Sequence, residues 1–166
     1  GKSTFLRTIG LNLVLSYIGA PVFSDDFTCG IFNIYTCMRT KDNLEENISS
    51  FYAEILRIKI LIEASKKGED VFFLLDEIFK GTNSLDRHVG AIELIKQLIN
   101  SGAIGLVSTH DLELCDLEKY DNRIENYNFR EYYEDNKIKF DYKLRVGKSE
   151  TQNAIHLMKL AGIEFK

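Results

Sequence analysis

Apolar residues recur along the first two thirds of the chain in two patterns, and each pattern predicts a different kind of element. Spacings of three and four residues predict helices over residues 5–17, 42–67 and 86–100. Continuous apolar runs predict buried strands over residues 71–75 and 103–108, and aromatic and β-branched content predicts another strand over 31–39. This alternation predicts an α/β fold with a mostly parallel sheet flanked by helices.

The last third of the chain has a different pattern. After a short helix at residues 112–119, two strands are predicted over residues 123–132 and 137–146. The turn-forming residues 134–136 join them, so we expect a β-hairpin beside the α/β part. A further helix is predicted over residues 153–160. Since no repeat or linker-like tract interrupts the chain, we expect one domain over residues 1–166.

The composition is ordinary for a globular protein, with 45% hydrophobic and 28% charged residues. A net charge of −4 argues against a domain that itself holds nucleic-acid backbones, so any DNA would be bound by other domains. The three cysteines show no C-x-x-C spacing, which indicates neither a disulfide framework nor a zinc site. We therefore expect a reducing, cytoplasmic setting. Since no apolar run is long enough to span a bilayer, we expect no membrane contact by this chain.

The start of the first predicted helix carries the sequence Gly1-Lys2-Ser3-Thr4. The first turn of a helix has unpaired N–H groups and a positive dipole end, which attract anions. The sequence also matches the second half of the phosphate-loop pattern G-x-x-x-x-G-K-[ST], in which lysine reaches the phosphates and the hydroxyl binds Mg²⁺. The first half would precede Gly1, so we expect a piece of a longer protein. By itself, this piece should bind nucleotide weakly or not at all.

The chain contains a second copy of the short pattern, Gly147-Lys148-Ser149. Tyr142 stands where the first glycine of a phosphate loop would have to be. We therefore interpret this second copy as structural.

Three candidate catalytic residues follow the two apolar strands. Asp76 and Glu77 come directly after residues 71–75, and His110 comes shortly after residues 103–108. Parallel strands deliver such residues to one edge of a sheet, where ligands bind. In nucleotide hydrolysis one carboxylate holds magnesium and the other orients and deprotonates water, while a histidine can contact the terminal phosphate. The alternative is that the acids only cap the sheet edge and that the histidine is structural.

Four separated motifs can be matched to one family. They are residues 1–7, residues 48–51 with Glu54, residues 75–77 with Gly81-Thr82, and residues 108–110. Residues 142–147 and 153–155 extend the match toward the end of the chain. Together they resemble the ATPase domain of the MutS family of DNA mismatch repair and recombination proteins. The resemblance implies a P-loop NTPase of the ABC-ATPase type. It also implies a homodimer that hydrolyses ATP with Mg²⁺ and couples hydrolysis to DNA binding by other domains.

The resemblance also implies roles for single residues. Gly1, Lys2, Ser3 and Thr4 resemble the end of the Walker A loop, with the Ser3 hydroxyl on the metal. Asp76 and Glu77 resemble the Walker B acids, with Asp76 on magnesium and Glu77 on water. His110 resembles the histidine near the γ-phosphate.

Ser49 resembles the residue that reaches across a dimer to the partner's nucleotide. The alternative for Ser49 is an ordinary residue at the start of a helix. We expect the aromatic residues of that helix, which covers residues 42–67, to lie in the core.

The sequence departs from the family pattern at several positions. Phe79 and Lys80 replace the usual glycine and arginine after the acids, Asn83 replaces a serine, and residues 152–154 replace Ser-Tyr-Gly. Two alternatives to the ATPase remain. One is an interaction or dimerisation module with a degenerate ATP site. The other is another ABC-type DNA-maintenance ATPase, against which the missing L-S-G-G-type signature counts.

Overall fold

The computed structural model describes residues 1–38, 47–134 and 137–149. The chain divides into two compact units, Gly1–Arg123 and Ile124–Lys166. Each unit is described below by itself, and the expectation of one domain over residues 1–166 stays a prediction.

A parallel sheet forms the centre of the first unit. Its strands are β1 (Asn33–Cys37), β2 (Val71–Asp76) and β3 (Ile104–Ser108), in the order β1-β2-β3, and both pairs are parallel. Strand β2 lies between the other two strands, and its residues Leu74 and Leu75 are 0% exposed. The predicted α/β class with a parallel sheet and helices is thereby confirmed.

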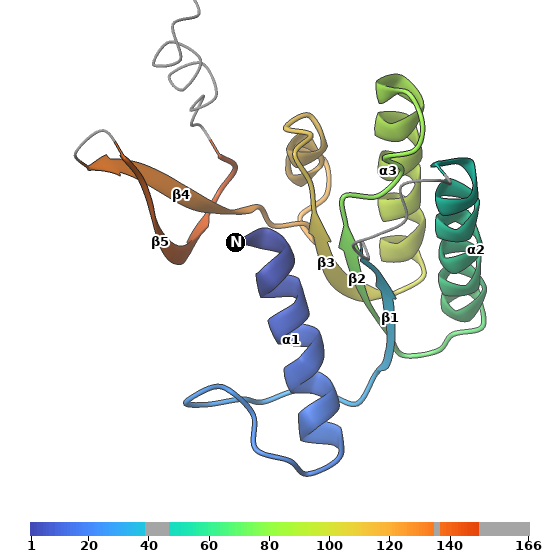
Figure 1. Ribbon diagram of the computed structural model, residues 1–166. Helices are drawn as coiled ribbons and strands as arrows, with labels where there is room; N and C mark the ends of the chain where they lie inside the picture. The colour runs from blue at the N-terminus through green and yellow to red at the C-terminus, as the bar shows by residue number, and fades with distance from the viewer. Residues whose placement is uncertain (39–46, 135–136, 150–166) are drawn as a thin grey trace, which may run out of the picture. The chain divides into compact units, whose positions relative to one another are not determined.

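Helices cover both faces of this sheet. Helix α1 (Lys2–Tyr17) contacts β2 and β3, whereas α2 (Asn47–Lys66) contacts β1 and β2 and also packs against α3 (Ser84–Asn100). Figure 1 shows α1 on one side of the sheet and α2 and α3 on the other. With helices on both faces, the central strand β2 is buried at all but one of its positions, which explains its continuous apolar run.

The buried face of α2 differs from the predicted one. Tyr52 is 63% exposed, so the prediction that the aromatic residues of this helix lie in the core is wrong for Tyr52. Ile58, which belongs to the predicted apolar stripe, is buried, and so is Leu61. Phe51 shares a face with Ile58, seven residues later, whereas Tyr52 is turned by about 120° from Ile58 around the helix.

Some element boundaries also differ from prediction. Helix α3 begins at Ser84 rather than residue 86, because the Asn83 side chain accepts a hydrogen bond from the Asp86 N–H group at 2.9 Å and caps the helix. The predicted short helix is a 3₁₀ helix, η1 (Leu114–Lys119). The first strand is shorter than the predicted 31–39, and residue 39 lies outside the described residues.

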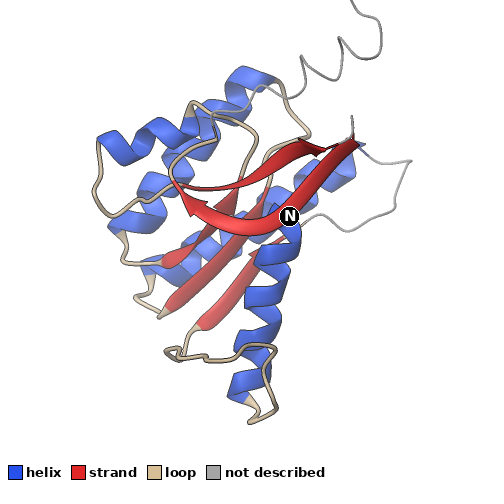
Figure 2. Cartoon of the chain, turned by 90° about the vertical axis from the view of Figure 1, so that its left-hand side faces the viewer, coloured by secondary structure: helices blue, strands red, loops and turns tan. Residues whose placement is uncertain are grey.

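The second unit contains the predicted hairpin. Strands β4 (Tyr127–Glu134) and β5 (Lys137–Val146) pair antiparallel, and Tyr127 lies opposite Val146 (Figure 2). Strand β4 starts four residues later than predicted. The helix predicted over residues 153–160 lies outside the described residues.

None of the helices in the described part of the chain has both the length and the apolar character needed to cross a bilayer.

Candidate active site

The ends of β2 and β3 form one edge of the sheet. Asp76, the last residue of β2, lies opposite Ser108, the last residue of β3. The N–H group of Glu77 donates to the Ser108 carbonyl at 2.9 Å, so the backbone is still paired one residue beyond the strand. The structure thus brings Asp76 and Glu77 beside the segment that carries His110.

Lys2 reaches the same edge from the start of α1. Its Nζ donates to the Thr109 carbonyl at 2.6 Å and lies 3.2 Å from Nδ1 of His110. Burial lowers the pKa of Lys2, and the nearby Asp76 and Cys115 partly oppose that shift. A partly desolvated ammonium group next to a helix N-terminus is well suited to an anionic ligand.

Asp76 is a buried carboxylate with an unused oxygen. The residue is 9% exposed, and its Oδ1 has no hydrogen-bond partner among the described residues, nor does Oγ of Ser108. Leaving a buried carboxylate oxygen unpaired is costly, so such an atom calls for a partner. Magnesium prefers oxygen ligands and is often held by one or two carboxylates together with phosphate groups. The chemistry of Asp76 therefore fits a bound Mg²⁺.

The turn after β2 has an unusual backbone. Glu77 and Phe79 adopt positive φ angles of 52° and 61°. For residues with a Cβ this conformation costs about 1–2 kcal/mol each, and such strain is frequently found at active sites. The turn directs the Glu77 carboxylate toward two neighbours. Its Oε1 lies 2.6 Å from Nε2 of His110, and its Oε2 contacts the Lys80 ammonium group.

His110 lies between Lys2 and Glu77 and contacts both side chains. The pKa of His110 is lowered, mainly by partial burial and to a smaller extent by the positive charges of Lys2 and Lys80. The side chain is nevertheless 76% exposed. The imidazole is then neutral at about pH 7. The tautomer that fits both contacts has its Nε2–H group donating to Glu77 and its Nδ1 accepting from Lys2.

The other predicted site residues lie at the starts of helices α1 and α2. Gly1 precedes α1 and its carbonyl accepts from the Phe5 N–H group at 2.9 Å, while Ser3 and Thr4 lie in the first turn. Ser49 lies in the first turn of α2, and its side chain is outside what the structure describes. Its proposed contact with a partner's nucleotide therefore stays a prediction.

Glu54 has a role that the sequence did not indicate. Its Oε1 accepts a hydrogen bond from the backbone N–H group of Phe79 at 2.6 Å. The residue belongs to one of the matched motifs, but nothing in the sequence links it to a turn 25 positions away.

His88 and Asp111 form a second contact that sequence reasoning missed. Nδ1 of His88 lies 2.7 Å from the Asp111 carboxylate, and Nε2 lies 3.6 Å from Glu113. Burial acts to raise the pKa of Asp111, but the hydrogen bonds from His88 and from the N–H groups of Glu113 and Leu114, together with the charge of His88, lower it on balance. The Asp111 N–H group also donates to Oγ1 of Thr109 at 2.9 Å. These bonds tie α3 to the segment that carries His110.

The fold and the site together define the class to which this chain belongs. It is a parallel α/β domain in which a helix-start lysine, two carboxylates and a histidine meet at the carboxyl edge of the sheet. The family model described as MutS domain V matches residues 1–165. The chain belongs to the MutS family.

Curated relatives agree with this family. The "DNA mismatch repair protein MutS" of Roseiflexus sp. (strain RS-1) is 31% identical over 98% of this chain, and that of Thermotoga maritima is 32% identical over 98%. The protein of the same name from Geobacillus sp. (strain WCH70) is 31% identical over 97%. The chain spans 15%, 20% and 19% of the lengths of these three relatives.

Proposed function

We propose that this chain is the ATP-binding and ATP-hydrolysing part of a MutS-like DNA repair protein. One observation carries the proposal. The Lys2 ammonium group, the His110 ring and the Glu77 carboxylate form a connected series, with distances of 3.2 and 2.6 Å between them. A phosphate-binding cation and a carboxylate that positions water are groups that phosphoryl transfer uses, and a histidine beside them can donate to a phosphoryl oxygen.

In this proposal the start of α1 binds the phosphates of ATP. The N–H groups of the first turn and the Lys2 ammonium group supply the donors, with Gly1 and Thr4 on either side of Lys2 and Ser3. Ser3 and Asp76 would hold Mg²⁺, and the unpartnered Oδ1 of Asp76 supports that assignment. A metal held by these residues would supply positive charge that offsets the negative charge of the phosphate groups.

Hydrolysis then uses Glu77 and His110. Glu77 orients the attacking water and takes its proton while the water oxygen bonds to the γ-phosphorus and ADP leaves. When ATP is bound, the Nε2–H group of neutral His110 would turn from Glu77 to the transferred phosphoryl group and donate a hydrogen bond to it, which would leave the Glu77 carboxylate free for the water. The contact between Glu77 and His110 supports this arrangement, because it places both groups beside one another.

DNA binding and dimer formation belong to the complete protein in this proposal. The net charge of −4 suits a chain that leaves the DNA backbone to other domains. Ser49 would contact the nucleotide of the partner in a homodimer, and the protein would act in the cytoplasm. The names of the relatives support a task in DNA mismatch repair.

The chain offers a matched pair of variants to test ATP binding. Lys2 follows a glycine at the start of a helix, whereas Lys148 follows Gly147 after strand β5. In the complete protein, Lys2→Ala should raise the Kd for ATP at least about tenfold, since charge-assisted hydrogen bonds to phosphate are lost. Lys148→Ala should leave the Kd within about twofold of the wild-type value. Isothermal titration calorimetry measures both.

The opposite result would argue for a different function. If Lys2→Ala binds ATP as tightly as the wild-type protein, the start of α1 is not the phosphate site. An interaction module with a degenerate site would then account better for the chain.

A further inference from the structure

Helix α2 contacts the turn that carries Glu77 and supports its backbone. The Glu54 carboxylate on α2 accepts the backbone N–H group of Phe79 at 2.6 Å. One turn earlier on the same helix, Phe51 packs against Gly81, where a Cβ atom would lie only 2.7 Å from the Cβ atom of Phe51. Helix α2 therefore contacts the turn at two positions, just after Glu77.

The turn needs such support because its backbone is strained. Phe79 has a φ angle of 61° and is buried, and its ring lies near Gly90 of α3. A glycine would adopt this conformation without steric cost, but a residue with a Cβ atom does so only when surrounding contacts impose it. The hydrogen bond to Glu54 is one such contact, and it acts on the peptide group between Ile78 and Phe79.

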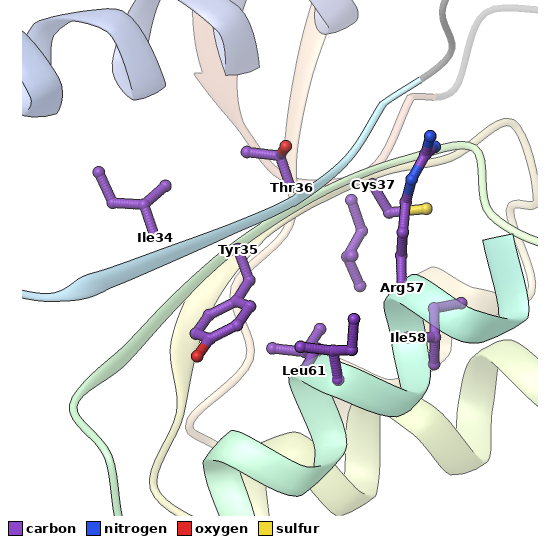
Figure 3. Close-up of a pocket in the computed structure, with 9 residues that line it drawn as sticks. Ile34, Tyr35, Thr36, Cys37, Arg57, Ile58 and Leu61 are labelled. Atoms are coloured by element: carbon purple, nitrogen blue, oxygen red, sulfur yellow. The ribbon is translucent and has the colours of Figure 1, made fainter. Parts of the chain in front are cut away.

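Burial and two neighbouring groups act on the Glu54 carboxyl group in opposite directions. Burial raises the pKa of Glu54, while the Phe79 N–H group and the Arg57 guanidinium act against that shift. Arg57 and Cys37 line a hollow of about 150 Å³. Figure 3 shows Arg57 extending from α2 toward Cys37 at the end of β1. Burial raises the pKa of Cys37 to about 11, so the thiol is neutral. It therefore does not compete, as an anion, with Glu54 for the Arg57 guanidinium group.

We propose that Glu54 is a positioning residue for Glu77. By holding the Phe79 N–H group it fixes the left-handed turn, and the turn fixes the direction of the Glu77 carboxylate toward His110. In this role Glu54 acts on Glu77 through the backbone of the turn. The effect on catalysis rests on the proposed ATPase function, whereas the effect on the turn does not.

Three variants of the complete protein separate the hydrogen bond from other effects. Glu54→Gln keeps an acceptor oxygen of the same reach but removes the charge, and Glu54→Ala removes the acceptor. Glu63→Ala is the control, because Glu63 is an exposed residue of the same helix that pairs with the exposed Lys59. If Glu54→Ala does not fold, Glu54→Asp replaces it, since the shorter side chain withdraws the acceptor.

Hydrogen exchange of the Phe79 amide reads the turn without using ATP. Glu54→Ala should speed its exchange at least about tenfold, because a buried hydrogen bond to a charged acceptor is lost. Glu54→Gln should stay within about threefold of the wild-type rate, and Glu63→Ala should leave the rate unchanged. Unchanged protection of Phe79 in Glu54→Ala would overturn the proposal, even if the protein proved to hydrolyse no ATP.

The kinetic constants for ATP read the consequence for Glu77. Glu54→Ala should lower kcat about tenfold with KM within about twofold, because the base is misdirected while the phosphate site is intact. Glu54→Gln should recover most of the lost kcat. Equal loss in both variants, or a loss confined to KM, would contradict a positioning role. A wild-type protein without ATPase activity would instead contradict the proposed function, and the exchange result would still decide the role of Glu54.

Discussion

Replacing Glu77 with glutamine should lower kcat for ATP hydrolysis by about 10²–10⁴-fold, the range expected when a general base is removed. Glutamine has nearly the same size and keeps an oxygen that can face His110, but its amide cannot take a proton from water. ATP binding should therefore stay within about threefold of wild type, because Lys2 and the start of α1 are unchanged. Single-turnover phosphate release and calorimetry on the complete protein measure the two quantities.

Glu93→Gln is a suitable control for this experiment. Glu93 is an exposed residue of α3 that pairs with Lys96, so the same loss of charge occurs away from the site. We expect this variant to hydrolyse ATP at the wild-type rate. A Glu77→Gln protein that also kept the wild-type rate would place the base elsewhere.

Leu75→Ala should have the largest effect on stability. Leu75 is 0% exposed and lies between Cys37 of β1 and Val107 of β3, directly before Asp76. Removing its side chain leaves a cavity in the sheet, which costs about 2–5 kcal/mol of unfolding free energy. Hydrogen exchange of the β2 amides in increasing urea measures this locally in the complete protein.

An exposed leucine gives the matched control. Leu85 in the first turn of α3 is 69% exposed, so Leu85→Ala should change the unfolding free energy by less than about 0.5 kcal/mol. If Leu75→Ala destabilised β2 no more than Leu85→Ala, the assignment of β2 as the buried central strand of the sheet would be wrong.

The sequence predicted the sheet and the helices because their patterns differ clearly in period. The run of residues 71–75 has no helical spacing, and α3 has a regular apolar stripe that ends at Ser101-Gly102. The same reasoning brought Asp76 and His110 to one edge, since parallel strands present their carboxyl ends together. These inferences depend on neighbours in the sequence or on a general rule of topology.

What the sequence did not predict depends on particular tertiary contacts. The positive φ of Phe79 is imposed by the fold, because no local propensity favours that conformation for phenylalanine. The bond from Glu54 to that residue joins segments 25 positions apart, and the pairing of His88 with Asp111 spans 23. Tyr52 matched a helical stripe in sequence, yet the sheet lies on another face of α2.

The most direct test is a crystal structure of the complete protein with Mg²⁺ and a non-hydrolysable ATP analogue. We expect the terminal phosphate to lie within hydrogen-bonding distance of Lys2 and His110, and the metal to be bound by Asp76 and Ser3. A nucleotide bound elsewhere, or a metal that Asp76 does not contact, would contradict the assignment of this sheet edge as the site of ATP hydrolysis.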